Sequence, residues 1–215
     1  MKHIKSIALA ASTAAALMLG SGMASANNVV TVNTVQIFGT IDPAKINDYT
    51  EYIAGVNLYE ALTTLDGSGA IQPLLSESWS TSADGLTWTF KLKKGATFQD
   101  GSPIEAKDVV WSVNRLLAIN EGPSYLFEGV LSEGSVTEID SSTVQFKLEK
   151  TYAPFLTTTP ILFVVNSDLA KENAGDGDPW AQDYIANNSI GAGAFYLDSW
   201  ERGAGMTIKA YEGYH

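Results

Sequence analysis

The fold of this chain is decided by one stretch, Thr87–Leu117, which reads TWTFKLKKGATFQDGSPIEAKDVVWSVNRLL. Its first six residues alternate between polar and apolar, which is the period of a half-buried strand. The apolar side chains that would share one face are Trp88, Phe90 and Leu92. Asp100-Gly101 then indicates a turn, because glycine takes positive φ without a Cβ clash. Four later residues recur at helical spacing on one face, whereas Ser112 and Arg115 fall elsewhere: Val109, Val113, Leu116 and Leu117. The stretch predicts a strand, a turn and a helix in immediate succession.

The order of residues in this stretch closely resembles the signature of the family 5 solute-binding proteins of ABC transporters, which are periplasmic peptide, dipeptide and nickel receptors. Further segments resemble the family in the same order along the chain: Asp42-Pro43, Leu58–Leu62, Pro73–Trp79 and Ile190–Trp200. The resemblance implies a binding protein and not an enzyme.

Several positions depart from the family pattern. Ala61 replaces a usual glycine, Ala194 a usual proline, and Ala192 a usual threonine, so a hydroxyl contact at position 192 is lost. Glu105 stands where the family often has threonine as the helix cap. Glutamate is a weaker cap, so we expect Asp108 to support the start of the signature helix instead.

The resemblance also implies the architecture. We expect a mixed α/β (α+β) fold, namely a lobe of the type II periplasmic-binding-protein class with an inserted subdomain. Segments 27–62 and 164–215 would form parts of that lobe, and residues 63–163 would form the insertion. Members of the family are much longer, so the resemblance implies a fragment whose second lobe is absent.

The first 26 residues predict a cleavable secretion signal. Lys2 and Lys5 give a positive head, Ile7–Leu19 an apolar middle, and Ala24-Ser25-Ala26 a small-residue cleavage site. The apolar run is shorter than the roughly 20 residues that a membrane-spanning helix needs. The chain has no cysteine, and therefore neither a lipid-attachment residue nor a disulfide. These features predict a freely soluble periplasmic protein.

Composition excludes some classes of function. The net charge of −11 becomes −13 once Lys2 and Lys5 leave with the signal, and such a surface repels nucleic acids and anionic lipids. An apolar fraction of 45% with five tryptophans and nine tyrosines argues against disorder. We expect a folded chain that has no nucleic-acid partner.

Periodicity and turn residues predict the other elements. An extended segment is expected to begin at residue 71. Strands are expected over these residues: 29–38, 76–81, 87–92, 135–139, 143–148, 161–165, 195–200 and 206–211. Helices are expected over these residues: 49–62, 123–131, 153–159, 168–172 and 180–186. In the first of these helices, the following side chains are expected to share one apolar face: Tyr52, Val56, Tyr59 and Leu62.

Catalytic and metal sites find little support. His215 is the only histidine beyond the signal and there is no cysteine, so neither a Ser-His-Asp set nor a zinc site is available. Asp176-Gly177-Asp178 with Asp183 slightly resembles a calcium loop but lacks the alternating oxygen ligands, which favours a turn. Gly191-Ala192-Gly193 is too short for a dinucleotide loop. We therefore predict no catalytic residue, no metal and no cofactor.

Four binding residues follow from the resemblance: Asn47, Asp48, Tyr49 and Tyr125. The first three follow the Asp42-Pro43 motif, where peptide-binding relatives pair with the ligand backbone, a contact that tolerates varied side chains. Their alternative role is the cap of the helix that begins at Tyr49. Tyr125 matches a cleft-facing tyrosine of the family, and its alternative role is core packing.

The favoured function is a monomeric periplasmic receptor that delivers a small solute to the membrane permease of an ABC importer. A short peptide is the favoured solute, while nickel, sugars and other solutes stay open. One alternative is a secreted hydrolase that uses paired carboxylates such as Asp42 and Asp48. Another is a surface-interaction module with a broad apolar patch and no cleft.

Overall fold

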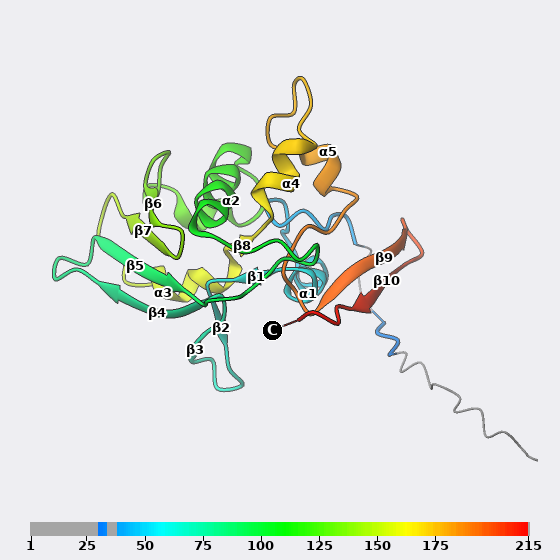
Figure 1. The fold of residues 1–215 in the computed structure, drawn as a ribbon, viewed down its shortest axis with the longest axis horizontal. Helices are drawn as coiled ribbons and strands as arrows, with labels where there is room; N and C mark the ends of the chain where they lie inside the picture. The colour runs from blue at the N-terminus through cyan, green and yellow to red at the C-terminus, as the bar shows by residue number, and fades with distance from the viewer. Residues whose placement is uncertain (1–29, 34–37, 215) are drawn as a thin grey trace, which may run out of the picture. The chain divides into compact units, whose positions relative to one another are not determined.

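The computed structural model describes residues 30–33 and 38–214. The predicted signal, and residues 29 and 34–37 of the first predicted strand, lie outside the described residues; residues 30–33 form neither helix nor strand. The elements follow in this order (Figure 1): α1 (Tyr49–Leu58), β1 (Glu60–Ala61), β2 (Thr63–Leu65), β3 (Ile71–Pro73), β4 (Ser76–Thr81), β5 (Thr87–Leu92), α2 (Ala106–Ile119), the 3-10 helix η1 (Gly122–Phe127), β6 (Val136–Asp140), β7 (Thr143–Lys147), α3 (Phe155–Thr158), the 3-10 helix η2 (Thr159–Ile161), β8 (Phe163–Val164), α4 (Ser167–Glu172), α5 (Gln182–Ile185), β9 (Phe195–Glu201) and β10 (Gly205–Ala210).

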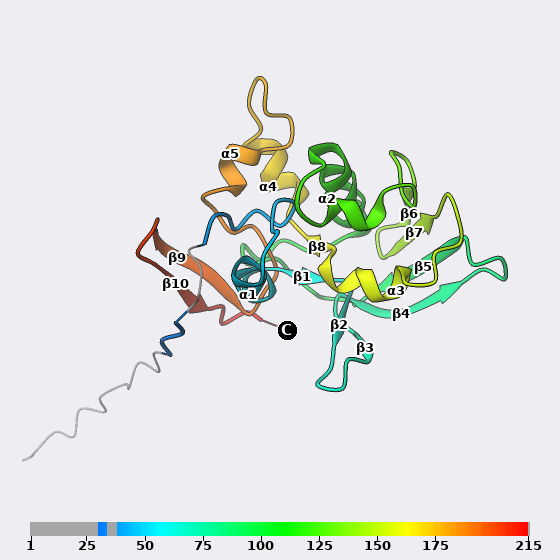
Figure 2. The same ribbon diagram turned by 180° about the vertical axis from the view of Figure 1, so that it is seen from behind.

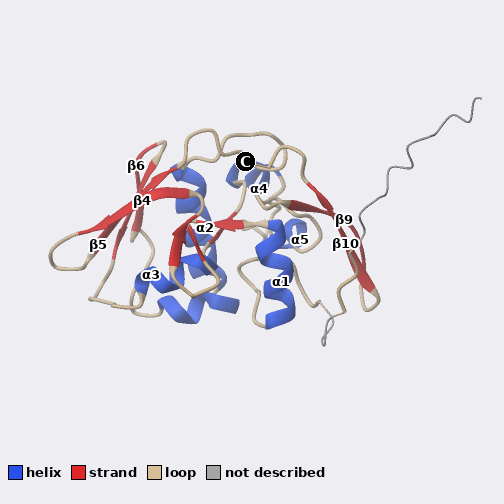
Figure 3. Ribbon diagram, turned by 90° about the horizontal axis from the view of Figure 1, so that it is seen from below, coloured by secondary structure: helices blue, strands red, loops and turns tan. Residues whose placement is uncertain are grey.

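Four antiparallel strands form the main sheet in the order β4-β5-β7-β6. The predicted strands at 76–81 and 87–92 are confirmed as β4 and β5, which form a hairpin with Trp79 opposite Phe90. Three smaller sheets have two strands each, β2–β3, β9–β10 and β1–β8, and the last joins segments far apart in the chain. Within residues 38–214, the main sheet and the β9–β10 hairpin lie at opposite ends, with α1 and α2 between them (Figures 2 and 3). The predicted mixed α/β class is confirmed.

Two hydrophobic clusters stabilise these elements. The sheet core packs the main sheet against α2 and α3, and its centre is a chain of aromatic contacts from Phe90 through Phe146 to Phe155, with ring centroids 5.5 and 5.4 Å apart. The α1 core gathers apolar residues of α1, β8, α4 and α5. Sheet-core residues lie within 62–164 apart from Ala44 and Ala192. This distribution parallels the predicted insertion at 63–163, and the domain boundaries stay a prediction.

Helix α2 is buried on two sides. Val109, Val113 and Leu116 are buried in the sheet core as expected, while Leu117 is half-buried. The helix lies closest to β6 and β7, and it shares the sheet core with Phe90 and Leu92 of β5. The residues that the sequence placed on other faces are also buried: Ser112 and Arg115. A helix between two cores has no fully solvated side.

The prediction for α1 is wrong in length and face. The helix ends at Leu58, because Tyr59 takes an extended conformation and the next two residues pair with β8. Val56 is 46% exposed, whereas Ala54 and Gly55 are buried. A Cβ on Gly55 would lie 2.8 Å from Ile46 Cδ1 and 3.0 Å from the Phe163 ring, so small residues allow this close approach.

Other differences are local. The predicted strands at 135–139, 143–148, 195–200 and 206–211 are confirmed within one residue as β6, β7, β9 and β10. Strand 161–165 shortens to β8, helix 153–159 to α3, and helix 123–131 becomes η1. The last predicted helix starts two residues late, because Ala181 takes a left-handed conformation with φ of 51°. Strand β2 and its partner β3 were not separately predicted.

The signature turn joins distant segments. The Gln99 side-chain amide donates to the carbonyl oxygens of Leu58 and Gly193 at 3.2 and 3.1 Å, and its backbone N–H donates to that of Gly191 at 3.1 Å. Asp100 Oδ2 accepts a hydrogen bond of 2.8 Å from Asn166, which caps α4. Residues of this turn that resemble the family signature therefore hold distant segments of the fold together.

The start of α2 is supported by Asp108, as predicted. Its Oδ2 accepts from the Glu105 N–H at 2.9 Å, and its Oδ1 accepts from the N–H and hydroxyl of Ser167 at 3.1 and 2.7 Å. Burial raises the pKa of this carboxyl, and the hydrogen bonds from Ser167 and Glu105 oppose the shift. Asp108 thus connects α2 to the start of α4.

We expect Gly193→Ala to lower the free energy of unfolding by about 3 kcal/mol, the upper part of the range for overpacked sites. A Cβ at Gly193 would lie 2.2 Å from the carbonyl oxygen of Asn57 and 2.5 Å from the carbonyl carbon of Leu58. Backbone atoms at the end of α1 would have to move. Urea denaturation measures the change, with Gly67→Ala as control, because a Cβ there meets nothing within 4 Å. Equal stability of the two variants would refute the packing argument.

Candidate ligand-binding site

The loop before α1 is held by the Glu51 carboxylate. Its Oε1 accepts from the N–H groups of Gly39 and Thr40 at 3.2 and 3.1 Å, and its Oε2 accepts from that of Asn47 at 3.0 Å. Glu51 is only 5% exposed. Hydrogen bonds to an ionised acceptor are stronger than neutral ones, so both ends of the loop are fixed onto the helix.

The first three predicted binding residues lie where this loop enters α1. Asp48 caps the helix, its Oδ1 accepting from the Glu51 N–H at 2.9 Å, so the capping role is confirmed. Asn47 is exposed, and Tyr49 is 74% exposed at the first position of the helix. Ligand contact by these residues stays a prediction.

The other end of the loop is anchored by Asp42. Its two carboxylate oxygens each receive a hydrogen bond of 2.6 Å from Arg115, and its Oδ1 also accepts from the Ala44 N–H at 3.0 Å. Both side chains of the ion pair are almost fully buried. Burial and the nearby Asp42 charge raise the pKa of the Tyr59 hydroxyl, so this phenol stays neutral beside the pair.

These contacts argue against the hypothesis that Asp42 and Asp48 are the catalytic carboxylates of a hydrolase. Asp42 is fully buried and bound to Arg115, and Asp48 caps a helix. A glycosidase-type mechanism needs two carboxyl groups facing one cleft, one of them free to give up a proton. Neither carboxylate is available for that role.

The fourth predicted residue, Tyr125, lies on η1 and is 71% exposed, so the core-packing alternative is wrong. The start of η1 packs on the loop of Asp42. Gly122 has a φ of 48°, and a Cβ there would lie 2.8 Å from the carbonyl oxygens of both Ala44 and Ile46. The structure therefore places η1 against the loop that leads to Asn47–Tyr49.

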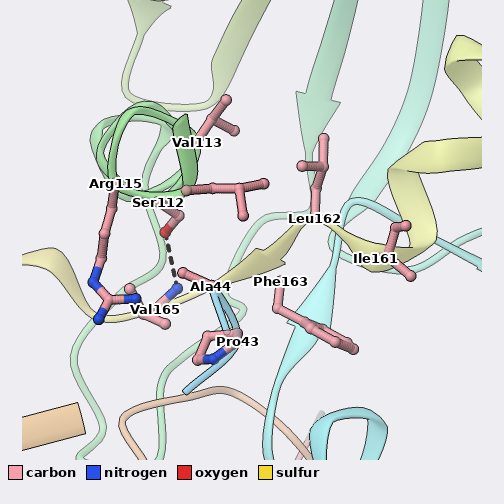
Figure 4. A pocket seen from close by; sticks show the side chains of 10 residues that line it. Pro43, Ala44, Ser112, Val113, Arg115, Ile161, Leu162, Phe163 and Val165 are labelled. Atoms are coloured by element: carbon pink, nitrogen blue, oxygen red, sulfur yellow. Dashed lines mark hydrogen bonds between the residues drawn. The ribbon is translucent and has the colours of Figure 1, made fainter. Parts of the chain in front are cut away.

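A small cavity lies behind this loop, between α2 and β8 (Figure 4). The Ser112 hydroxyl in its wall donates to the Asp108 carbonyl at 2.6 Å and accepts from the Val165 N–H at 3.0 Å. Its volume of about 20 Å³ leaves space for one water molecule at most. This cavity is therefore too small for a solute.

The described residues contain no group of three acidic or histidine side chains close enough to hold a metal ion. The Asp176-Gly177-Asp178 segment forms the predicted turn, with a bridge between Gly175 and Asp178. Asp178 Oδ2 accepts from the Asp183 N–H at 2.9 Å and so leads into α5. In the part of the chain that the structure covers, no helix is long and apolar enough to cross a bilayer.

Comparison with known families explains the order of these motifs. Residues 70–215 match the family described as bacterial extracellular solute-binding proteins, family 5 Middle. The chain belongs to this family. Family 5 proteins bind solutes and are not enzymes, in agreement with the interpretation drawn from the sequence.

Curated relatives support the same assignment. The chain is 34% identical over 176 residues to the probable D,D-dipeptide-binding periplasmic protein DdpA of Escherichia coli K12, and this match covers 79% of the chain and 33% of the relative. It is 30% identical over 205 residues to the glutathione-binding protein GsiB of Escherichia coli O6:K15:H31, covering 94% of the chain and 38% of the relative. The chain thus spans about a third of the length of these family 5 relatives.

A solved structure shows the same fold. The substrate-binding domain of an oligopeptide ABC transporter from Bacillus anthracis superposes with a TM-score of 0.74 at 24% identity. The superposition covers 85% of this chain and 38% of that one. The arrangement of helices and sheets described above is therefore a family 5 arrangement.

The residues that hold this candidate site together were not found from the sequence. Glu51 is the third residue of α1, a position where an acid is usual in capping motifs, and that was the available signal. The pairing of Arg115 with Asp42 had no local signal, because 72 residues lie between them. Gln99 likewise acts through contacts distant in the chain.

We expect Glu51→Gln to lower the free energy of unfolding by about 1.5–3 kcal/mol, the range for a hydrogen bond to a charged group. The new amide NH₂ would face at least one backbone N–H that now donates to the carboxylate. Urea denaturation measures the loss, and hydrogen exchange should show faster exchange at Gly39, Thr40 and Asn47. Glu77→Gln is the control, because the ion pair of Glu77 with Lys91 is exposed. Unchanged exchange at all three amides would contradict the role of Glu51.

Proposed function

We propose that this chain belongs to a periplasmic receptor that binds a short peptide or peptide-like solute and delivers it to an ABC importer. The observation that carries the proposal is the pair of exposed tyrosines, Tyr49 and Tyr125, on segments that are fixed to one loop. Exposed aromatic side chains on rigid backbone are typical of binding surfaces, because ordering them costs little entropy. Relatives named for D,D-dipeptide and glutathione binding support the peptide-like class.

The chemistry of the loop suits a receptor of this kind. Asn47 and Tyr49 present backbone groups at an exposed helix start, where they can pair with the main chain that all peptides share. Tyr125, on the 3-10 helix whose start packs on this loop, supplies apolar area and a hydroxyl group. No bond is made or broken, and specificity comes from the shape that two lobes form when they close about a hinge.

The proposal extends to architecture and location. Segments 27–62 and 164–215 would contribute one lobe, residues 63–163 would be the insertion, and the two hydrophobic clusters favour that division. A second lobe would close over the tyrosines. Export by the signal at residues 1–26 would place the monomeric receptor in the periplasm, in keeping with the relative named periplasmic. The membrane permease of the importer would be its protein partner.

Tyr125→Ala should weaken solute binding by about 1–2 kcal/mol, the scale expected when one interface aromatic is truncated. Isothermal titration calorimetry on the purified protein, with D-Ala-D-Ala, L-Ala-L-Ala and reduced glutathione as probes, first identifies a solute that binds. The variant is then compared with Tyr196→Ala, a control on the exposed face of β9. Both variants should keep the parent melting temperature.

Two outcomes would defeat the proposal. The first is the absence of saturable binding for every peptide probe together with the absence of any peptide among small molecules that co-purify with the protein. The second is equal affinity of Tyr125→Ala and Tyr196→Ala, which would place the solute elsewhere.

A further inference from the structure

Left-handed residues turn the chain sharply between α2 and η1. Asn120, which ends α2, has a φ of 55°, and Gly122, the first residue of η1, has a φ of 48°. Asparagine is one of the few residues with a side chain that enter this conformation readily, and glycine enters it without a steric cost. The turn brings η1, which carries Tyr125, against the loop before α1.

The backbone of Gly122 packs on the middle of that loop. A Cβ on this residue would lie 2.8 Å from the carbonyl carbon of Lys45, as close as it would lie to the carbonyl oxygens of Ala44 and Ile46. All three are backbone atoms, so none of them can rotate away as the end of a long side chain could. Any larger residue at position 122 would therefore displace η1 or the loop.

The part of the loop that receives Gly122 is itself fixed. Both of its ends are held by buried carboxylates, through the N–H groups of Ala44 and Asn47 at 3.0 Å each. The ion pair between Lys45 and Glu121 is 3.6 Å long and both side chains are partly exposed, so it contributes little. The close approach of Gly122 therefore decides how η1 lies on the loop.

We propose that Gly122 is a positioning residue for the solute, because it fixes Tyr125 relative to Tyr49 before the solute arrives. The relative position of the two tyrosines follows from the contacts of Gly122 alone, and its role in binding rests on the proposed function. A preformed surface binds more tightly, because less ordering of side chains and loops offsets the binding energy. Gly122 acts through η1 and does not itself contact the solute.

The absence of cysteine from the chain allows this geometry to be measured directly. Spin labels on Tyr49→Cys with Tyr125→Cys should give one narrow distance distribution by pulsed electron paramagnetic resonance. Adding Gly122→Ala should broaden that distribution or shift its maximum. Adding Gly95→Ala should leave it unchanged. Gly95 is the matched control because its φ is also positive, at 80°, but a Cβ there meets nothing within 4 Å.

Affinity is measured on the unlabelled protein with D-Ala-D-Ala, L-Ala-L-Ala and reduced glutathione as probes. Gly122→Ala should weaken binding about tenfold, whereas Gly95→Ala should not change it. Tyr125→Ala should cost about tenfold in the parent but less than about threefold in Gly122→Ala, because a displaced tyrosine has less contact to lose. A merely structural role of Gly122 would leave the two losses additive.

Glu51→Gln keeps the test decisive if Gly122→Ala does not fold, because it loosens the loop on which Gly122 packs. It should also broaden the label distance, and the exposed control Glu77→Gln should not. An unchanged label distance in Gly122→Ala, or in Glu51→Gln where Gly122→Ala does not fold, would overturn the proposal. A changed distance with parent affinity, or with additive losses, would overturn it too. If the parent binds none of the three probes, the proposed function fails, while the label distances still decide whether Gly122 fixes the two tyrosines.

Discussion

Arg115→Met should lower the free energy of unfolding by about 3–5 kcal/mol, the cost of removing one partner from a buried ion pair. The substitution would leave the Asp42 carboxylate fully buried and without the two guanidinium hydrogen bonds of 2.6 Å that now compensate its charge. It would also remove the 2.8 Å bond from Arg115 Nε to the Trp180 carbonyl. Both the loop before α1 and the segment before α5 would lose hydrogen bonds that now join them to α2.

Chemical denaturation of the variant and of two controls measures this effect. Lys107→Met is the matched control on the same helix, because Lys107 forms exposed ion pairs with Glu105 and Asp168 and should cost less than about 1 kcal/mol. The double variant Asp42→Leu with Arg115→Met should recover at least half of the loss, since it removes the uncompensated charge. If Arg115→Met costs no more than Lys107→Met, the ion pair does not support the loop.

Helix α2 has one buried face that its sequence reveals and another that its sequence does not. Its apolar face was predictable because Val109, Val113 and Leu116 recur at helical spacing. Its second buried face was not, because Ser112 and Arg115 look like solvated residues until their distant partners are known. Apolar periodicity indicates which residues are buried away from water. It does not reveal buried polar residues, because each of these needs a hydrogen-bond or charge partner that can lie anywhere in the chain.

Helix α1 shows the opposite error. Its large side chains suggested a face through Val56, yet the buried surface is made of small residues, Ala54 and Gly55. Close packing against Phe163 and Ile46 selects for small volume there, and a hydrophobic pattern does not distinguish small residues that pack from small residues that are merely tolerated. The end of the helix was missed for a related reason, since β1 forms only by pairing with β8, about 100 residues later.

The sequence indicates candidate binding residues but not the contacts that hold their loop in place. Asn47, Asp48, Tyr49 and Tyr125 came from motif order, and the structure places all four at or near the surface. What brings η1 against the loop is the absence of a side chain at Gly122, where a Cβ would collide with two carbonyl oxygens. Glycine in a sequence indicates a turn as readily as a close contact, so only the structure separates these roles.

Val113→Asp should lower the free energy of unfolding by about 4 kcal/mol or more at pH 7, because it would bury a carboxylate without a partner. Val113 is 2% exposed in the sheet core. Val113→Ala is the matched control, since it removes the same packing without adding charge and should cost about 2 kcal/mol. Chemical denaturation of both variants at pH 7 gives the contribution of the charge as the difference between them.

The pH dependence of that difference identifies its cause. Burial raises the pKa of the introduced carboxyl above the unfolded value of about 3.9, so the folded state retains a proton that the unfolded state releases. The variant therefore keeps more of its stability below about pH 4 and loses it as pH rises through the range between the two pKa values. The gap between Val113→Asp and Val113→Ala should be smaller at pH 3.5 than at pH 7. A gap that does not change with pH, or an Asp variant as stable as the Ala variant, would show that position 113 is open to water and that α2 does not form the core of this scaffold.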